Sequence, residues 1–291
     1  MDAEEEKAPA PPAPRLTRGG VLVVLMTLLT AGNLMLVVTF FREGERNPPV
    51  LLRGTATSPA ETVEAFFVVS SVDANSGSLS GRLEFRPDAQ LVGPDHDTLT
   101  RDLRLYVNTL RGEELRVFKA GQVPTPVEVT LPLTGGLVRR YPFDRHSTVL
   151  EVEFEVDGRE LATSVLFQAP VDGYRVVVSQ RGGARPGVAA DLEVRRSHSV
   201  IVVCLFLHSV ILTVAVSILI LATAVVLFGK PLEATVLGFI GGALFAIPAV
   251  RGLLPAAPPM GSLMDFVVVF WCQGVVAVSL VAMMVTYVRR R

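Results

Sequence analysis

Long apolar runs without charged residues constrain this sequence more than any other feature. Residues 199–228 contain no Asp, Glu, Lys or Arg, and neither do residues 234–250 and 266–288. An α-helix rises about 1.5 Å per residue, so roughly 20 apolar residues cross the ~30 Å hydrocarbon core of a bilayer. The runs therefore predict three membrane-spanning helices, which we place at residues 199–228, 232–254 and 263–288.

A fourth apolar run lies near the N-terminus, at residues 21–41. It is longer than the apolar core of a signal peptide, roughly 7–15 residues, and Arg42 and Glu43 follow it in place of a small-residue cleavage site. We therefore expect this run to stay in the protein as a first spanning helix. Residues 1–20 are acidic and rich in Ala and Pro, which predicts a disordered cytoplasmic tail.

Basic residues beside the apolar runs predict the orientation of the chain. Lys and Arg next to spanning helices are retained in the cytoplasm. With four crossings, the following basic residues all fall on one side: Arg15, Arg18, Lys230 and residues 289–291. We therefore predict a multi-pass protein of the cell membrane, with both termini cytoplasmic and residues 42–198 outside.

The outer residues 42–198 show the period-two pattern of β-strands. Leu150, Val152, Phe154 and Val156 alternate with glutamates, which gives a strand one buried and one wet face. Similar alternation recurs in four segments, residues 83–85, 103–107, 127–131 and 174–178. Seven to nine such strands predict an antiparallel, Ig-like β-sandwich. Together with the four helices in a one-plus-three arrangement, this makes an α+β membrane protein, with residues 42–60 as a tether.

Composition and motifs argue against several classes of function. The net charge is −1, with no clustered basic face for nucleic acid. Cys204 and Cys272 both lie in apolar runs, so we expect neither a disulfide framework nor a thiolate metal cluster. His96 is a single histidine in a polar loop and is expected to be solvated. Because the common catalytic signatures are absent, we expect a non-enzymatic protein without cofactor or metal.

The most distinctive short run is RRYPFDR at residues 139–145. Pro142 holds the backbone of this loop stiff, Tyr141 and Phe143 flank it with apolar surface, and Asp144 stands among arginines. One interpretation is a structural corner between two strands. The other is a contact through which Tyr141, Pro142, Phe143 and Asp144 couple the outer domain to the membrane helices.

Two further features concern contacts of the helices. Arg251 and Asp265 lie at the outer boundaries of neighbouring spans, and we predict that they form an ion pair across the connecting loop. Gly238 and Gly242 belong to a face of small residues that recur every fourth position, which predicts close helix packing. Lining of a pore or a lipid groove is the alternative for this face.

His208 lies inside the first of the three C-terminal spans, where an ionisable side chain is a functional hypothesis by default. Carboxylates that would complete a proton relay are missing from the interior of these spans. We therefore expect a neutral histidine that is hydrogen-bonded to a neighbouring helix.

Three stretches resemble a family of integral membrane proteins: residues 103–108 (LRLYVN), 130–144 (TLPLTGGLVRRYPFD) and 245–271 (FAIPAVRGLLPAAPPMGSLMDFVVVFW). The family is uncharacterised, mainly actinobacterial, and defined only as a domain of unknown function. The resemblance implies one N-terminal helix, an outer β domain and three C-terminal helices, and it implies no activity. His146 stands where family members usually have an aromatic residue.

A more remote resemblance is to the pentameric ligand-gated channels. Those proteins have an outer β-sandwich with a (Y/F)PFD loop, here residues 141–144, an arginine before the first pore-domain helix, here Arg196, and a proline-bearing link, here residues 255–259. Glu233 stands where cation-selective members place a charged ring. The chain differs from them in its additional N-terminal helix and in lacking their fourth pore-domain helix.

Two functions follow from these observations. The first is an integral membrane protein that displays an outer β domain for binding or for scaffolding at the envelope, with the lipid bilayer and a membrane or envelope protein as partners. The alternative is an oligomeric channel or sensor in which the loop at residues 141–144 couples the outer domain to the helices. The sequence leaves the oligomeric state open.

Overall fold

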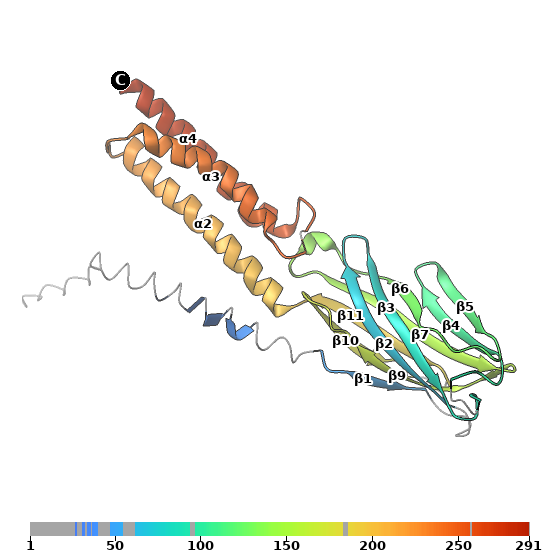
Figure 1. The fold of residues 1–291 in the computed structure, drawn as a ribbon. Coiled ribbons are helices and arrows are strands. Elements are labelled where there is room, and N and C mark those ends of the chain that lie inside the picture. Colours follow the sequence, from blue (N-terminus) through green and yellow to red (C-terminus); the bar gives the residue numbers. More distant parts are fainter. Residues whose placement is uncertain are drawn as a thin grey trace, which may run out of the picture.

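The computed structural model describes residues 47–54, 62–93, 97–182, 186–256 and 258–290, with some helical residues between 27 and 39. A β domain and a bundle of three helices lie end to end (Figure 1). The predicted tail at residues 1–20 lies outside the described residues. So does most of the predicted first span at residues 21–41, although the described residues within it are helical.

The β domain consists of two sheets. The first sheet has five strands, in the order β1 (Val50–Arg53), β9 (Ala162–Gln168), β2 (Thr62–Asp73), β3 (Ser78–Pro87) and β6 (Val127–Pro132). Strands β2 and β9 pair in parallel, and the other neighbours pair antiparallel. The prediction of a purely antiparallel sandwich is therefore wrong at this pair. A parallel pair needs a long crossover, and residues 74–161 provide it.

The second sheet is antiparallel throughout its described pairs. Its order is β10 (Tyr174–Gln180), β11 (Val188–Arg196), β7 (Arg145–Val156), β4 (Leu103–Thr109) and β5 (Gly112–Phe118), with the short β8 (Arg159–Glu160) on β7. Residues of β7 alternate between buried and more exposed along most of the strand, as the period-two pattern predicts.

The core lies between the two sheets and is closed by aromatic contacts. Phe67 and Phe167 stack within the first sheet at 5.6 Å between ring centroids. Phe85 reaches from the first sheet to Phe118 and Phe154 of the second sheet, at 5.1 and 5.0 Å. These rings hold the sheets together, since aromatic pairs at such spacing stabilise beyond the area that they bury.

The three C-terminal helices occupy nearly the predicted ranges. They are α2 (His198–Val226), α3 (Ala234–Gly252) and α4 (Phe270–Arg289), and the π-helical turn η2 (Asp265–Val269) leads into α4. All three are long and apolar enough to span a membrane, with η2 counted as part of the last span. The structure therefore supports an integral membrane protein.

No flexible linker separates the second sheet from the first of these helices. Strand β11 ends at Arg196, Ser197 caps the helix by accepting a hydrogen bond from the Val200 amide at 3.3 Å, and α2 begins at His198. A Ser side chain at this position satisfies an amide that the helix leaves unpaired. Strand β11 therefore continues into α2 with a single residue between them.

Candidate functional site

The loop between β6 and β7 lies against the ends of the helices that face the β domain (Figure 1). It contains the 3-10 turn η1 (Val138–Arg140), followed by the cis peptide bond between Tyr141 and Pro142. Although Tyr141 belongs to the β domain, its ring is fully buried and its hydroxyl donates a hydrogen bond to the Pro255 carbonyl at 3.0 Å. Pro255 follows α3, so this bond joins the β domain to the segment between α3 and α4.

The same loop is held by a buried ion pair. Arg196 Nε lies 3.1 Å from each carboxylate oxygen of Asp144, and both side chains are almost completely buried. His146 Nε2 lies 3.1 Å from Asp144 Oδ2 and is also buried. A buried carboxylate is tolerated when it is paired and hydrogen-bonded, and Asp144 has both kinds of partner.

Two tyrosine rings complete the surroundings of the Arg196 guanidinium. Its central carbon lies 5.0 Å from the ring centroid of Tyr141 and 4.6 Å from that of Tyr174. Nη1 has no hydrogen-bond partner among the described residues, and these aromatic faces supply its electrostatic contact instead. Burial raises the pKa of both Tyr141 and Tyr174, so each phenol stays neutral to a higher pH than a free tyrosine does.

An apolar cluster surrounds the Tyr141 ring and brings all three helices to this point. Its other members are Val200 and Cys204 of α2, Leu254 after α3, and Met264 before α4. Since these residues lie in or beside the ends of three helices, a displacement of Tyr141 would disturb the contacts of each helix. The four predicted coupling residues thus lie where the β domain meets the helices, a place that we call the junction. Pro142 is buried there, and Phe143 is 48% exposed.

The segment between α3 and α4 is itself held rigid by the predicted Arg251 and Asp265 pair. The structure brings the two together at 3.1 Å (Nε to Oδ1) and 3.0 Å (Nη2 to Oδ2). Arg251 also donates to the carbonyls of Pro258 and Pro259, and Asp265 accepts from the amides of Gly261 and Ser262. This network fixes the loop that carries the Pro255 carbonyl.

The surroundings of His208 differ from the expectation. His208 is buried, but its Nδ1 lies 2.7 Å from the carbonyl of Cys204 in its own helix, and Nε2 has no partner among the described residues. The expected hydrogen bond to a neighbouring helix is therefore not present in this part of the chain.

The small-residue face of α3 is exposed. Added Cβ atoms at Gly238 and Gly242 would meet nothing within 4 Å in the described structure. The hydroxyl groups of Ser209, Thr213 and Ser217 on α2 are likewise on exposed residues, and they donate to carbonyls of their own helix. Within the described chain these faces contact no second helix, so the predicted helix packing would need a helix beyond those that the structure describes.

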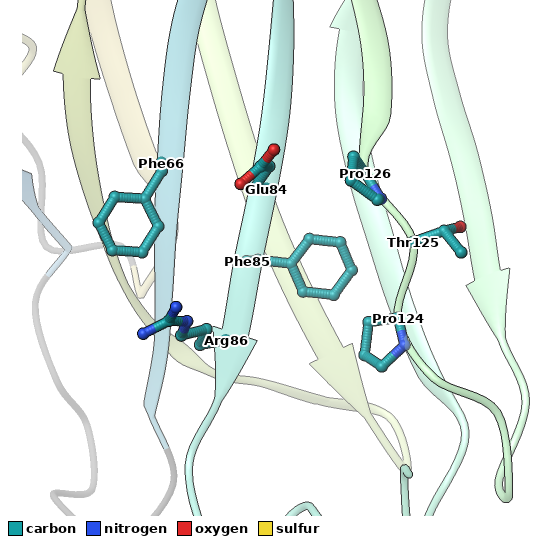
Figure 2. A pocket seen from close by; sticks show the side chains of 7 residues that line it. All are labelled: Phe66, Glu84, Phe85, Arg86, Pro124, Thr125 and Pro126. Atoms are coloured by element: carbon teal, nitrogen blue, oxygen red, sulfur yellow. The ribbon is translucent and has the colours of Figure 1, made fainter. Parts of the chain in front are cut away.

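A groove opens on the β domain, at β2, β3 and the segment that precedes β6. It has a volume of about 490 Å³, and its lining residues are Phe66, Glu84, Phe85, Arg86, Pro124, Thr125 and Pro126. Figure 2 shows Arg86 beside Phe66 of β2, while Phe85 points toward the segment with Pro124 and Pro126. Glu84 is paired with Arg82 at 3.1 Å. The groove therefore combines apolar side chains with one cationic and one anionic side chain, Arg86 and Glu84.

The described residues contain no candidate metal site, because no group of three or more His, Cys, Asp or Glu side chains among them could hold an ion. His96 lies outside the described residues. The free thiols Cys204 and Cys272 are both buried within the helices.

Two family models match the chain, and both carry the description of a domain of unknown function. DUF4436 matches residues 53–195, and DUF8686 matches residues 196–290. The division falls at the end of β11, where the β domain passes into α2. A comparison with curated proteins finds no match. The chain is thus similar to two uncharacterised domain families in tandem, a β-rich one and a helical one.

Sequence reasoning missed three contributors to the junction. His146 and Tyr174 were not singled out as site residues, and the acceptor of the Tyr141 hydroxyl proves to be the Pro255 carbonyl. A signal for Tyr174 was present, since it opens a period-two segment and pairs with Arg196 across β10 and β11. Backbone carbonyls carry no such signal, because every residue has one.

Proposed function

We propose that this protein is a non-enzymatic membrane sensor in which the outer β domain binds a partner or ligand and passes the resulting change to the membrane helices. The observation that carries this proposal is the double attachment of one loop. Asp144 holds Arg196 at the entrance to α2, while Tyr141 of the same loop holds Pro255 at the exit of α3.

A protein that only displays a domain needs nothing more than a tether. Here the strand-to-helix connection is a single residue, and the contacts around it are buried and charged. The buried pair fixes the loop to the strand that enters α2, because separating the pair would leave a charge buried without its partner. The Tyr141 hydroxyl and the apolar cluster around its ring then tie the same loop to the helices, which resists independent motion of the two parts. Display for envelope scaffolding therefore explains the junction less well than signal coupling does.

The groove at Phe66 and Arg86 supports a binding role for the outer domain. Ligand sites are mostly apolar hollows with a few well-placed polar groups. This groove is lined by two aromatic rings and two prolines, with Arg86 beside them. It fits a ligand that has an apolar body and an acidic group, such as the side chains of an acidic peptide.

The proposed orientation puts residues 42–198 outside the cell membrane and both termini in the cytoplasm. Lys230, Arg289 and Arg290 support it, since they lie at the end of the helix bundle away from the β domain. Membrane-impermeant labelling of Ser76→Cys and of Lys230→Cys in intact cells tests this orientation. Only Ser76→Cys should react, and the reverse pattern would exclude it.

A bulky label in the groove tests whether the outer domain is coupled to the helices. Thr125 is exposed and lines the groove, so Thr125→Cys can be alkylated with a bulky maleimide in the full chain. We expect altered hydrogen exchange at residues 197–204 and 253–263, and loss of that response when Asp144→Asn is added. Arg159→Cys is the matched control, an exposed site on β8 outside the groove. A label in the groove that leaves exchange at the junction unchanged would exclude a sensor and leave display as the function.

An oligomeric channel is the second candidate, favoured by the exposed faces of α2 and α3. The hydroxyl stripe of α2 and the small residues Gly238 and Gly242 of α3 are both open to contact with another chain. A channel requires a symmetric oligomer around a pore. Mass measurement of the purified protein in detergent decides this point, because a monomer would remove the channel from consideration.

A further inference from the structure

The loop at the junction presents a surface that the coupling network does not use. Leu137 is 61% exposed and Phe143 is 48% exposed, although both are large apolar residues of the β domain. Arg139 and Arg140 lie between them in sequence and are also exposed. These four residues, which we call the loop patch, combine apolar and cationic side chains on one short segment.

The loop patch belongs to a loop that contacts the ends of the candidate membrane-spanning helices. Tyr141, within the same loop, contacts the ends of α2, α3 and α4 through its apolar cluster and its bond to Pro255. On the helical side of this boundary Leu253 and Met260 are 70% and 83% exposed. Exposed apolar residues therefore occur both on the loop and on the segment between α3 and α4 that the loop contacts through Tyr141.

The cationic residues of the loop patch are open to an outside partner. Arg139 and Arg140 form the last turn of η1, and within the described part of the chain neither has an ion-pair partner. The nearest carboxylate in sequence, Asp144, is buried and occupied by Arg196 and His146. Phosphate groups attract such arginines, and the adjoining acyl region accepts the side chains of Leu137 and Phe143.

We propose that the loop patch binds the outer-leaflet surface of the bilayer, with Arg139 and Arg140 on the phosphates of anionic phospholipids and with Leu137 and Phe143 inserted beside them. This inference does not depend on a ligand in the groove or on signal coupling. It adds a third attachment of the junction loop, to lipid, besides those to Arg196 at the end of β11 and to the segment after α3. The lipid composition would then influence the position of Tyr141.

Fluorescence quenching in lipid nanodiscs tests the insertion. Trp271 is the single tryptophan of the chain, so Phe143→Trp in a Trp271→Phe background gives one reporter. We expect lipids with brominated acyl chains to quench this reporter, and to quench Leu137→Trp in the same way. Leu115→Trp is the matched control, because Leu115 is also 48% exposed but lies on β5, away from the helices (Figure 1). Quenching at residues 137 and 143 no stronger than at residue 115 would overturn the proposal.

Retention of anionic lipid tests the role of the two arginines in the loop patch. Purified protein is exchanged from mixed phosphatidylglycerol and phosphatidylcholine into detergent, and the retained lipid is measured by mass spectrometry. A basic residue near an anionic surface contributes roughly a fivefold preference, so Arg139→Gln with Arg140→Gln should lower phosphatidylglycerol retention about fivefold or more. Arg86→Gln with Arg159→Gln is the charge-matched control and should change nothing. Equal retention in both double variants would overturn the proposal.

Two other outcomes would also contradict it. Inorganic phosphate that displaces the lipid at moderate concentration would identify a soluble-phosphate site in place of a membrane contact. If co-reconstitution of another membrane protein abolishes the quenching, and if retention shows no preference for anionic lipid, the loop patch is a protein-docking surface.

Discussion

Arg196 Nε lies 3.1 Å from both carboxylate oxygens of Asp144, across 52 residues of sequence. Arg196 is the last residue of the strand that continues into α2, and Asp144 closes the loop that reaches the segment after α3. The pair therefore sits where the β domain meets two of the membrane helices. Its burial makes it sensitive to the loss of either partner.

Asp144→Asn should destabilise the full-length protein strongly. The change leaves the Arg196 charge buried without its counter-charge, which costs about 3–5 kcal/mol. Thermal unfolding in detergent measures the effect, and the double variant with Arg196→Gln should lose less than the sum of the single changes. Arg104→Gln is the control, because Arg104 pairs with Glu155 on the surface and should cost about 1 kcal/mol or less. Equal losses for Asp144→Asn and Arg104→Gln would contradict this account of the pair.

Tyr141→Phe should loosen the junction while leaving the domain folded. The ring and its contact with Arg196 remain, but the Pro255 carbonyl loses its donor, at a cost of about 1–2 kcal/mol. Hydrogen exchange should rise in residues 253–263. Tyr174→Phe is the matched control: its ring also faces Arg196, but it belongs to β10 and its hydroxyl does not reach Pro255. Faster exchange at residues 253–263 in both variants would show that the hydroxyl of Tyr141 is not the specific link.

Asp265→Asn should destabilise the segment between α3 and α4. Asp265 is buried and accepts bonds from Arg251 and from two amides, so its loss of charge should cost about 2–4 kcal/mol. Arg251→Lys tests the geometry: a lysine keeps the charge but cannot contact the carboxylate and the Pro258 carbonyl with a planar fork. Unchanged thermal stability of Asp265→Asn in detergent would count against a structural role for the pair.

The elements that could be predicted are those whose pattern is local. The charge-free runs gave the three helices, and the alternation of Leu150 to Phe154 gave β7, because burial follows directly from each pattern. Strand β5 lacks this signal, since nearly all of its residues are exposed at the edge of the sheet. Strand β1 lies in the segment expected to be a tether, and only its pairing with β9 makes it a strand.

Most residues of the site could be predicted from the sequence, but their contacts in space could not. The run at residues 139–145 identified the junction loop, and the positions of Arg251 and Asp265 at two helix ends suggested their pair. That Asp144 meets Arg196 follows from the antiparallel pairing of β7 with β11, which brings Arg145 opposite Arg195. Sequence alone does not give that register. The parallel pairing of β2 with β9 was likewise invisible, because alternation of side chains is the same in both directions.

Raising the pH above about 10 should destabilise the β domain through its buried tyrosines. Burial raises the pKa of Tyr141 and Tyr174 above the usual value of 10.0, so the native state keeps protons that the unfolded state loses. Stability is then fully present below pH 10 and falls as the pH rises, by about 1.4 kcal/mol per pH unit for each tyrosine that stays protonated.

The pH dependence of thermal unfolding, followed from pH 8 to about pH 12, measures this loss, with the range set by the unfolded tyrosine value near 10. Tyr141→Phe should reduce the slope by one proton, and addition of Tyr174→Phe should reduce it further. Tyr106→Phe is the control, because Tyr106 is only half-buried on β4. If the slope is the same with and without these two phenols, their burial does not set the alkaline limit, and the packing of Tyr141 between Arg196 and the three helix ends is looser than the structure indicates.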